Sequence, residues 1–344
     1  MREGWEYKKL NEVCDKGSSN IVINKLIDNN GDYPLYGASG LIKDIDFYHQ
    51  DKRYIGIVKD GAGVGRVNIY PAFSSLVGTM QYIFPKEGYS LDFIKYFLIK
   101  LDLSHCVSGA TIPHIYFKDY GKELIPTPSL DTQLAIVSEL DKINELIRLK
   151  KEQLKDFDNL AQSLFYEMFG DPVENEKGWE VKKLGEVYKM KSGDSLSTKS
   201  FEEGDIPVYG GNGISGYHNQ YNKDGSYIII GRVGVYCGNV RIVKGRFWLT
   251  DNAFELLYDN SSQNEVFVCS LLTHLNLRQY ANAAAQPVIS NNTLKHVSIP
   301  LPPLPLQHLF AQRIEQIEHQ KAEVQKAITD LETLLASRMQ YWFE

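Results

Sequence analysis

Two stretches of the sequence carry the kinds of side chain that contact nucleic acids. Four basic residues lie between positions 52 and 66, and no acidic residue occurs from Gly61 to Lys86; a similar basic window spans positions 223–246. Basic side chains contact phosphates, while arginine, amide and hydroxyl groups can read base edges. The candidates here are Lys59, Arg66, Arg232, Tyr236, Asn239 and Arg241. The same residues would equally suit a solvated sheet face, so both interpretations stay open.

Two further clusters are rich in small, non-ionic hydrogen-bonding residues. One occupies positions 108–114 and the other positions 286–292, with an additional asparagine at position 252. Amide groups can pair with the edge of adenine, so the second cluster favours adenine if it reads bases. A structured loop would have the same composition. The candidates are Ser108, Thr111, His114, Asn252, Gln286, Asn291 and Asn292.

The sequence contains no pattern that predicts catalysis or metal binding. The eight histidines form no His-x-x-x-His pair, and the four cysteines form no Cys-x-x-Cys pair. Residues Gly61–Arg66 resemble a nucleotide-binding loop, but they lead into a predicted strand and lack the Gly-Lys-Ser/Thr ending. A glycine-rich hairpin is therefore favoured. We predict a binding protein that is not an enzyme, with no catalytic residue, no metal site and no cofactor of its own.

The strongest feature of the chain is an internal duplication. Gly4–Leu10 (GWEYKKL) recurs as Gly178–Leu184 (GWEVKKL), 174 residues later. Ile125–Pro128 recurs as Ile299–Pro302, and each is followed five residues later by a glutamine. Several further matches keep this register to within one residue. Chance similarity does not produce so many matches in one register, so we predict two related globular blocks.

Each repeat ends in a long segment whose apolar residues recur at spacings of four and three. This pattern is typical of a two-stranded coiled coil. Gly170 and Pro172 stop the first helix, and residues 131–169 would form a helix roughly 58 Å long at about 1.5 Å per residue. Pairing both segments predicts an antiparallel coiled coil with pseudo-two-fold symmetry. The predicted seam contains Leu140, Ile143, Ile147, Leu154, Phe157, Ile314, Ile317, Val324, Ile328 and Leu331.

The predicted fold class is mixed α/β, with β-rich globular domains in tandem joined by the two long helices. Strands are expected at residues 54–58, 64–70 and 79–84, and at 227–231, 235–243 and 253–258. Shorter helices are expected at residues 90–101 and 265–277. The expected domains are residues 1–128 and 171–304, and the expected long helical segments are residues 129–170 and 305–344.

Composition places the chain among ordinary globular proteins. Of its 344 residues, 43% are hydrophobic and 23% are charged, and no apolar run has the length of a membrane span. The scattered cysteines and the polar N-terminus predict a cytoplasmic location. The net charge of −6 is uneven, since residues 1–128 carry 15 basic and 15 acidic side chains, and residues 171–304 carry 13 and 14. Most of the acidic excess lies in the helical segments, so the charge does not exclude DNA.

The duplicated plan resembles the specificity subunit of type I restriction–modification systems. The resemblance covers the whole chain and is carried by the repeated Gly-Trp-Glu-x-x-Lys-Leu motif and by the Ile-Pro-x-Pro…Gln entry into each long helix. It implies two target-recognition domains, each reading one half of a split site in double-stranded DNA. It also implies that the helices set the spacer and bind two DNA adenine methyltransferase subunits, which carry S-adenosylmethionine, with restriction subunits as further partners and no membrane.

Two alternatives come from other classes of protein. A coiled-coil scaffold or oligomerisation protein without DNA specificity would show no dependence on DNA in its assembly. An enzyme with a site assembled across the repeats would be active without a partner subunit. The sequence does not specify the DNA target or the spacer length.

Overall fold

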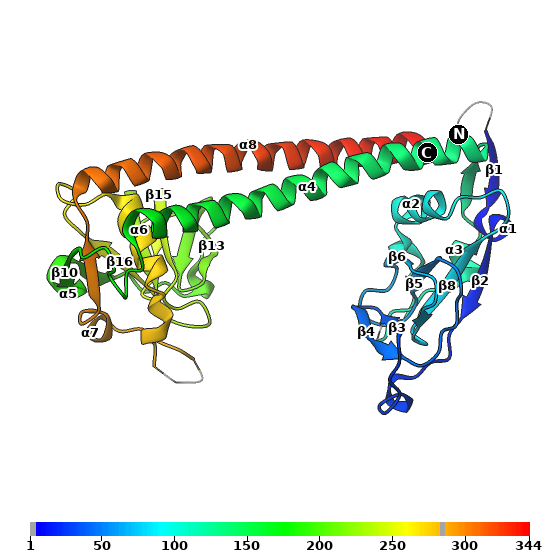
Figure 1. Ribbon diagram of the computed structural model, residues 1–344, viewed down its shortest axis with the longest axis horizontal. Coiled ribbons are helices and arrows are strands. Elements are labelled where there is room, and N and C mark those ends of the chain that lie inside the picture. The colour runs from blue at the N-terminus through cyan, green and yellow to red at the C-terminus, as the bar shows by residue number, and fades with distance from the viewer. Residues whose placement is uncertain (1–4, 110, 283–285) are drawn as a thin grey trace. The chain divides into compact units, whose positions relative to one another are not determined.

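The computed structural model describes residues 5–109, 111–282 and 286–344. Gly4, the first residue of the repeated motif, lies outside the described residues. The chain divides into two compact units: unit 1 is Met1–Lys151 with Lys326–Glu344, and unit 2 is Glu152–Gln325. The long helices α4 (Leu130–Phe169) and α8 (Leu304–Phe343) therefore each contribute residues to both units (Figure 1). No helix among the described residues is long and apolar enough to cross a membrane.

Unit 1 is built from three small sheets. The strands are β1 (Glu6–Lys9), β2 (Cys14–Ser18), β3 (Tyr33–Gly37), β4 (Gly40–Ile45), β5 (Tyr54–Val58), β6 (Val67–Tyr70), β7 (Ser75–Leu76), β8 (Met80–Pro85) and β9 (Leu124–Thr127). They pair in the orders β2-β8-β5-β6, β4-β3-β7 and β1-β9. The short helices are α1 (Leu10–Val13), η1 (Ile23–Lys25), α2 (Leu91–Leu101), η2 (Leu103–Cys106) and α3 (Phe117–Tyr120). All five residues of β5 are buried, so this strand lies at the centre of the core.

Unit 2 repeats this plan with a more continuous sheet. Its strands are β10 (Glu180–Lys183), β11 (Lys189–Ser192), β12 (Ile206–Gly210), β13 (Gly213–His218), β14 (Lys223–Gly231), β15 (Val240–Leu249), β16 (Ala253–Leu257) and β17 (Ser298–Leu301). Six of them pair as β11-β16-β14-β15-β12-β13, and β10 pairs with β17. The short helices are α5 (Leu184–Val187), η3 (Thr198–Ser200), α6 (Glu265–His274), η4 (Leu277–Tyr280) and α7 (Asn291–Leu294).

The two units differ where one long strand replaces two short ones. In unit 2, β15 pairs with β14 and, further along, runs parallel to β12, so it joins both parts of the sheet. In unit 1 the corresponding strand is divided into β6 and β7, and Phe73 between them has a left-handed backbone with φ of 55°. Because β7 pairs with β3 and β6 with β5, the sheet of unit 1 is split in two.

The glycine-rich stretch Gly61–Arg66 forms a tight turn between β5 and β6, as the hairpin interpretation predicted. Gly61, Gly63 and Gly65 all have φ between 85° and 87°, a backbone conformation that residues with a Cβ rarely adopt. The turn leads into a strand and not into a helix. The predicted strand 64–70 therefore begins only at Val67, because the turn occupies the residues before it.

The α2 and α6 helices cover the sheets of their own units. Leu91–Leu101 agrees with the predicted helix, and the Ser90 side chain caps it by accepting a hydrogen bond from the Phe93 amide at 3.3 Å. Glu265–His274 is shorter than predicted because Asn276, with φ of 46°, interrupts the helix before η4. Together with the two long helices, these elements confirm the predicted α/β class with β-rich blocks.

The long helices run antiparallel to each other within each unit. In unit 1, Arg338 pairs with Glu139, and Lys151 lies 2.8 Å from Glu332. In unit 2, Lys321 lies 2.8 Å from Asp158 on α4. The partly buried cations of the seam, Lys321 and Arg338, thus form ion pairs with the facing helix. Of the predicted seam residues, Leu140, Ile143, Ile147, Ile317, Val324 and Ile328 are buried, and Leu154, Phe157, Ile314 and Leu331 are half-buried.

Unit 2 contains a half-buried histidine whose pKa is lowered by burial. The His274 ring stacks on Phe165 with centroids 4.0 Å apart, and its Nδ1 lies 2.7 Å from the Ser270 carbonyl oxygen. Burial lowers the pKa of His274 from its ordinary value of 6.5, although the Ser270 carbonyl and Asp171 act in the opposite direction. The folded protein therefore binds a proton at this position less readily than the unfolded chain does.

We expect this histidine to destabilise unit 2 in mild acid. Its favourable contribution is fully present above the unfolded pKa and is lost as pH falls through 6.5 towards the lowered folded value. Urea unfolding at about pH 8 and about pH 5.5 should show a larger loss of stability in the wild type than in His274→Phe, which keeps the aromatic stacking without a titrating group. Equal losses in both proteins would contradict this assignment.

Candidate nucleic-acid interface

Two loops of unit 1 are joined by main-chain hydrogen bonds. The Gly61 amide donates to the Pro113 carbonyl at 2.9 Å, and the Ile115 amide donates to the Lys59 carbonyl at 2.9 Å. The second loop is closed on itself because the amides of Ser108 and His114 each donate to the other's carbonyl, at 2.9 and 2.8 Å. This arrangement, called here the loop strap, brings the basic turn after β5 beside the polar cluster at 108–114.

Unit 2 contains the same loop strap. The Gly234 amide donates to the Pro287 carbonyl at 2.9 Å, and the Ile289 amide donates to the Arg232 carbonyl at 2.9 Å. Because Lys59 and Arg232 accept the equivalent bond, they occupy the same position in the two repeats. Both straps join the turn after the central strand (β5 or β14) to the loop that follows η2 or η4.

The hydrogen bonds also show which residue corresponds to Arg66. The Arg66 carbonyl accepts from the Val58 amide at 3.0 Å, and the Asn239 carbonyl accepts from the Gly231 amide at 2.9 Å. Arg66 is therefore equivalent to Asn239, so a guanidinium in one repeat is replaced by an amide in the other. These groups would contact different partners, as expected if the two units read different bases.

In unit 1 the strap leaves several candidate side chains accessible to a ligand. Arg66 is exposed and donates to the Ala38 carbonyl at 3.1 Å, and Ser108 and Thr111 are exposed. His114 is half-buried, with Nδ1 3.1 Å from the Ile112 carbonyl oxygen. Lys59 lies 3.8 Å from Asp60, which offsets part of its charge. The five predicted residues of unit 1 thus lie on the two strapped loops.

In unit 2 the strap borders a hollow of about 470 Å³. Two predicted residues, Asn252 and Gln286, line it, and both are exposed. The Thr250 hydroxyl also lines it and is buried without a hydrogen-bond partner among the described residues. The other lining residues are Leu196, Thr198, Phe201, Gly210, Gly211, Asn212, Gly213, Ile214, Ser215, Val233 and Gly234. Amide and hydroxyl groups around one hollow can form hydrogen bonds with the edge of a base.

Three other predicted residues of unit 2 lie on the same group of turns and strands. The Arg232 guanidinium donates to Ser192 Oγ and to the Asp251 carbonyl, both at 3.4 Å, which holds it across the end of β11. Arg241 extends from β15 towards Gly213, where an added Cβ would lie 2.5 Å from its guanidinium. Tyr236 is 54% exposed at the tip of the turn.

Asn291 and Asn292 are not brought to the hollow. They begin α7, and Lys295 donates from Nζ to the Asn292 side chain at 3.2 Å. The Lys295 carbonyl at the end of α7 accepts from the Gly185 amide at 3.1 Å. Their side chains are exposed, but they do not line the hollow that contains Asn252 and Gln286.

The second basic window is less cationic than the sequence indicated. Lys223 is largely buried and pairs with Glu255, whose side chain is 7% exposed. Arg246 lies 3.1 Å from Asp224. Counting acids along the chain missed Glu255 because it lies on β16, which pairs with β14 in the sheet. Arg232, Arg241 and Lys244 remain the cations of this window for which the structure shows no carboxylate partner among the described residues.

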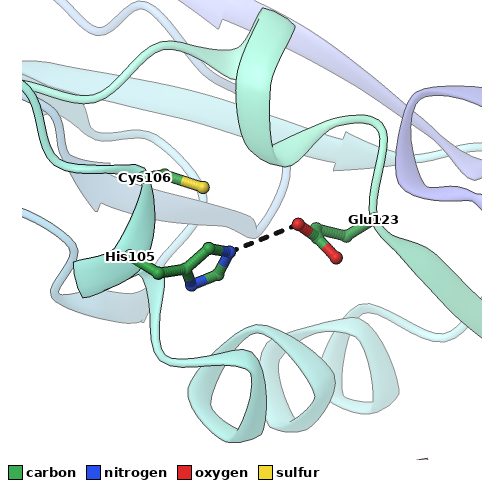
Figure 2. Close-up of side chains that lie close together, drawn as sticks. All are labelled: His105, Cys106 and Glu123. Carbon is green, nitrogen blue, oxygen red and sulfur yellow. Dashed lines mark hydrogen bonds and ion pairs between the residues drawn. The ribbon is translucent and has the colours of Figure 1, made fainter.

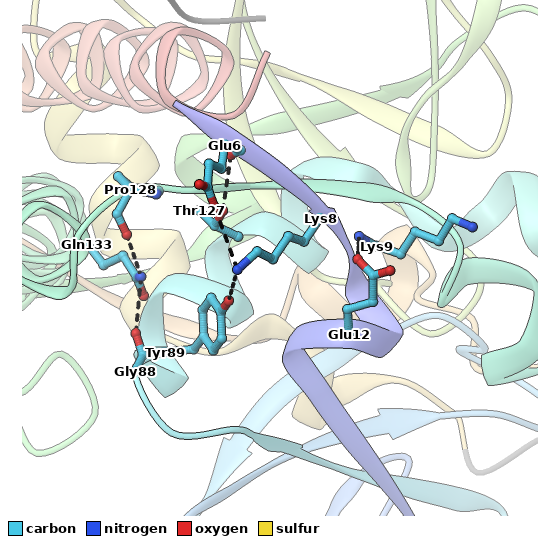
Figure 3. Close-up of polar contacts among 9 residues, drawn as sticks. All are labelled: Glu6, Lys8, Lys9, Glu12, Gly88, Tyr89, Thr127, Pro128 and Gln133. Carbon is cyan, nitrogen blue, oxygen red and sulfur yellow. Dashed lines mark hydrogen bonds and ion pairs between the residues drawn. The ribbon is translucent and has the colours of Figure 1, made fainter. Parts of the chain in front are cut away.

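The repeated sequence motifs hold the base of each long helix. β1 pairs with β9, and Thr127 Oγ1 donates to the Glu6 carbonyl at 3.1 Å. Gln133 is 1% exposed, and its Oε1 accepts from the Ser90 amide at 2.9 Å. Its Nε2 donates to the Pro128 carbonyl at 2.9 Å (Figure 3). Glu6 and Lys8 form a surface ion pair of 3.6 Å on β1.

Unit 2 uses the same device. Gln307 is 1% exposed, accepts from the Asn264 amide at 2.9 Å and donates to the Pro302 carbonyl at 2.8 Å. Each glutamine thus connects the start of a long helix to the start of α2 or α6. The motifs that repeat most clearly in the sequence therefore fix the start of each long helix and lie outside the strapped loops.

One group of side chains with metal-binding chemistry has no spacing pattern in the sequence. His105, Cys106 and Glu123 have ligand atoms within 4.8 Å of one another (Figure 2). Hydrogen bonds to the Asp102 carbonyl and to Glu123 raise the pKa of His105. Burial, with Glu123 and Asp119 nearby, raises the pKa of the Cys106 thiol. Adjacent histidine and cysteine were the only sequence signal, because the fold alone brings in Glu123.

Comparison with known proteins places the chain in one family. The type I restriction modification DNA specificity domain matches residues 2–156 and 176–333. The type I restriction enzyme EcoprrI specificity subunit of Escherichia coli is 30% identical over 256 residues, which cover 68% of this chain and 63% of that protein's length. The MjaIX specificity subunit of Methanocaldococcus jannaschii is 31% identical over 147 residues, covering 36% of this chain and 34% of that protein.

Solved structures share the fold. The crystal structure of the type I restriction-modification S subunit from M. genitalium has a TM-score of 0.64 and 18% identity, covering 100% of this chain and 98% of the other. A chain from a study of the assembly and conformational transition of the type I R-M system gives the same TM-score and identity, covering 99% of this chain and 97% of the other. With both repeats matched, the chain belongs to the family of the type I restriction modification DNA specificity domain and carries two copies of it.

Proposed function

We propose that the chain is the DNA specificity subunit of a type I restriction–modification system and is itself non-catalytic. Each globular block would read one half of a split target in double-stranded DNA. The observation that carries the proposal is the loop strap, which occurs in both units and presents different polar side chains in each. A shared scaffold with differing loop residues is what recognition of two different half-sites requires.

The net charge of each globular block indicates which contacts with DNA partner subunits would have to supply. Residues 1–128 and 171–304 are nearly neutral, so each block alone would neutralise few phosphates and bind DNA weakly. Methyltransferase subunits would supply the remaining phosphate contacts, S-adenosylmethionine and the transfer chemistry on adenine. Restriction subunits would join the same assembly, and a cytoplasmic location follows from its DNA substrate.

The long helices offer surfaces on which such partners could bind. On α4, Leu134, Leu146 and Leu149 are 51%, 48% and 46% exposed. Leu134 and Leu146 line a groove of about 700 Å³ together with Val137. Exposed leucines that gather along one groove form an apolar surface of the kind found at protein–protein contacts. They therefore support docking of another subunit.

Methylation mapping tests the proposal directly. The chain would be co-expressed with the methyltransferase encoded beside it in a host without DNA methylation, and modified bases would be located by sequencing. We expect one split motif with adenine methylated in both halves. A stable complex that produces no methylation would contradict the proposed role in targeting, and the absence of any complex would favour the scaffold alternative.

The hollow of unit 2 gives a prediction about one half-site only. Replacing Asn252 by alanine removes an amide from its lining, and each well-placed base contact contributes about 1–3 kcal/mol of discrimination. We therefore expect Asn252→Ala to relax the preference at one position of one half-site by about 5- to 150-fold. Methylation mapping measures this change.

The matched control is Asn260→Ala, which removes an exposed amide from the turn between β16 and α6, outside the hollow. This variant should keep the wild-type motif. An Asn252→Ala motif identical to the wild-type motif, or one altered in both halves, would exclude Asn252 from base reading by unit 2 alone.

A further inference from the structure

The group formed by His105, Cys106 and Glu123 lies at the base of the second strapped loop of unit 1. His105 and Cys106 are the last two residues of η2, and Glu123 directly precedes β9. His105 Nε2 lies 3.2 Å from a Glu123 carboxylate oxygen, and all three ligand atoms lie within 4.8 Å of one another (Figure 2). Among the residues that the structure describes, this is the one group of three or more such side chains close enough to share an ion.

The hydrogen bond on the far side of the imidazole orients it for a ligand. His105 Nδ1 lies 2.8 Å from the Asp102 carbonyl oxygen. A carbonyl only accepts, so Nδ1 carries the hydrogen and the lone pair of the neutral ring lies on Nε2. In the protonated ring Nε2 donates to the Glu123 carboxylate as an ion pair, and in the neutral ring its lone pair faces that carboxylate, so a metal ion can take the place of the proton between them. A backbone carbonyl holding the remote nitrogen is also the usual support of a metal-binding histidine.

The second repeat shows that the fold does not need these side chains. The 174-residue offset relates Leu103 at the start of η2 to Leu277 at the start of η4. The equivalents of the three residues are Gln279, Tyr280 and Val297, none of which offers an imidazole, thiol or carboxylate. Gln279 instead donates to the Leu275 carbonyl at 2.8 Å. The same backbone thus forms without the group, so its assembly in unit 1 is not a requirement of folding.

We propose that His105, Cys106 and Glu123 bind one divalent cation of the zinc type, with water as the fourth ligand. Nitrogen, sulfur and oxygen donors together suit a borderline-soft ion and do not suit magnesium or calcium. The side chains of His105 and Glu123 are 49% and 38% exposed, which leaves a path for the ion and room for water. Tetrahedral bonds of about 2.0–2.3 Å place ligand atoms about 3.4 Å apart, so side-chain rotation within the group is sufficient.

The ion would close the loop that carries Ser108, Thr111 and His114. Cys106 lies immediately before this loop, and Glu123 lies after α3, so a shared ion ties the two ends of residues 107–122 together. The strap already fixes the loop to Lys59 and Gly61. Metal binding would therefore slow amide hydrogen exchange in residues 111–122 and leave the equivalent described residues 286–296 of unit 2 unchanged.

Metal titration of the full-length, reduced chain tests the site. Cadmium is the probe, because a cadmium–thiolate bond gives an ultraviolet charge-transfer absorption, and zinc affinity is then measured by calorimetry. We expect one ion per chain in the wild type, loss of the absorption in Cys106→Ser, and at least tenfold weaker zinc binding in His105→Gln and Glu123→Gln. Cys269→Ser, which alters another half-buried thiol in α6, is the control and should keep the absorption.

Either of two results would overturn the proposal: a wild-type chain that gives no saturable absorption, or a folded Cys106→Ser chain that keeps it. Circular dichroism establishes folding. If Cys106→Ser does not fold, the His105→Gln variant gives the test, because this position is exposed. A purely structural His105–Glu123 pair predicts that this variant has lower stability and unchanged zinc binding. None of these readouts depends on DNA or on a partner subunit, so they stand apart from the test of the proposed function.

Discussion

Replacing Phe165 by alanine is expected to destabilise unit 2 by about 3–5 kcal/mol, the range found for removing a fully buried phenylalanine. Phe165 is 0% exposed and lies near the end of α4. Its ring contacts His274 at 4.0 Å, Phe169 at 5.2 Å and Phe310 at 5.9 Å between centroids. The substitution would leave a cavity where α4, α6 and the start of α8 meet, and these rigid helices could close it only in part.

The control is Leu160→Ala on the same helix, which shortens a leucine that is 50% exposed. It should change the stability of the free chain by much less, because most of the side chain already contacts water. Urea unfolding followed by circular dichroism gives both values, and hydrogen exchange assigns the loss to residues 152–325. Equal effects of the two substitutions would show that Phe165 is not the anchor between α4 and the core of unit 2.

Lengthening both long helices is expected to change the spacing between the two halves of the DNA target. The bases within each half should stay the same. Four residues inserted after Lys151 in α4 and four after Gln325 in α8 fall at the boundaries between the units. Four residues add one helical turn, about 6 Å, and DNA rises about 3.4 Å per base pair. The proposed role of the helices therefore predicts a spacer longer by at most about two base pairs.

Methylation mapping with the lengthened chain measures the spacer of the methylated motif. The control inserts the same four residues into the exposed turn at Asp259–Ser262, outside both helices, and should leave the spacer unchanged. An unchanged spacer in a folded, active helix-insertion variant would refute the idea that α4 and α8 measure the distance. A change in the bases read would show that the insertion also disturbed the strapped loops.

The elements with strong local signals were predicted closely from the sequence. The heptad pattern and Gly170 placed the first long helix at residues 131–169, and α4 is Leu130–Phe169. The repeat register correctly predicted two related blocks. The predicted starts of β6 and β15 were too early, at residues 64 and 235 instead of 67 and 240. The glycine-rich turns after β5 and β14 continue the residue pattern of a strand but do not pair with another strand. The division of one strand into β6 and β7 depends on the backbone at Phe73, for which the repeat gave no warning.

The candidate site could be predicted by composition but not by geometry. Lys59 and Pro113 are far apart in the sequence, and main-chain hydrogen bonds leave no residue-type signal, so the strap could not be inferred. Pairing across strands also hid Glu255 from the charge count, although it neutralises Lys223. The DNA-contacting roles of Arg66, Arg232 and their neighbours remain predictions that the mapping experiments decide.

The loop strap has a consequence for how this chain can evolve. It is made by amides and carbonyls, so the residues at its positions can change without losing the bonds, as Lys59 and Arg232 already illustrate. The main requirement is a residue other than proline wherever a backbone amide donates, and glycine wherever φ is positive. If the strapped loops read DNA as proposed, single substitutions at these positions would change the sequence preference while the loops stay in place. The target of the proposed complex would then change without a change in the backbone.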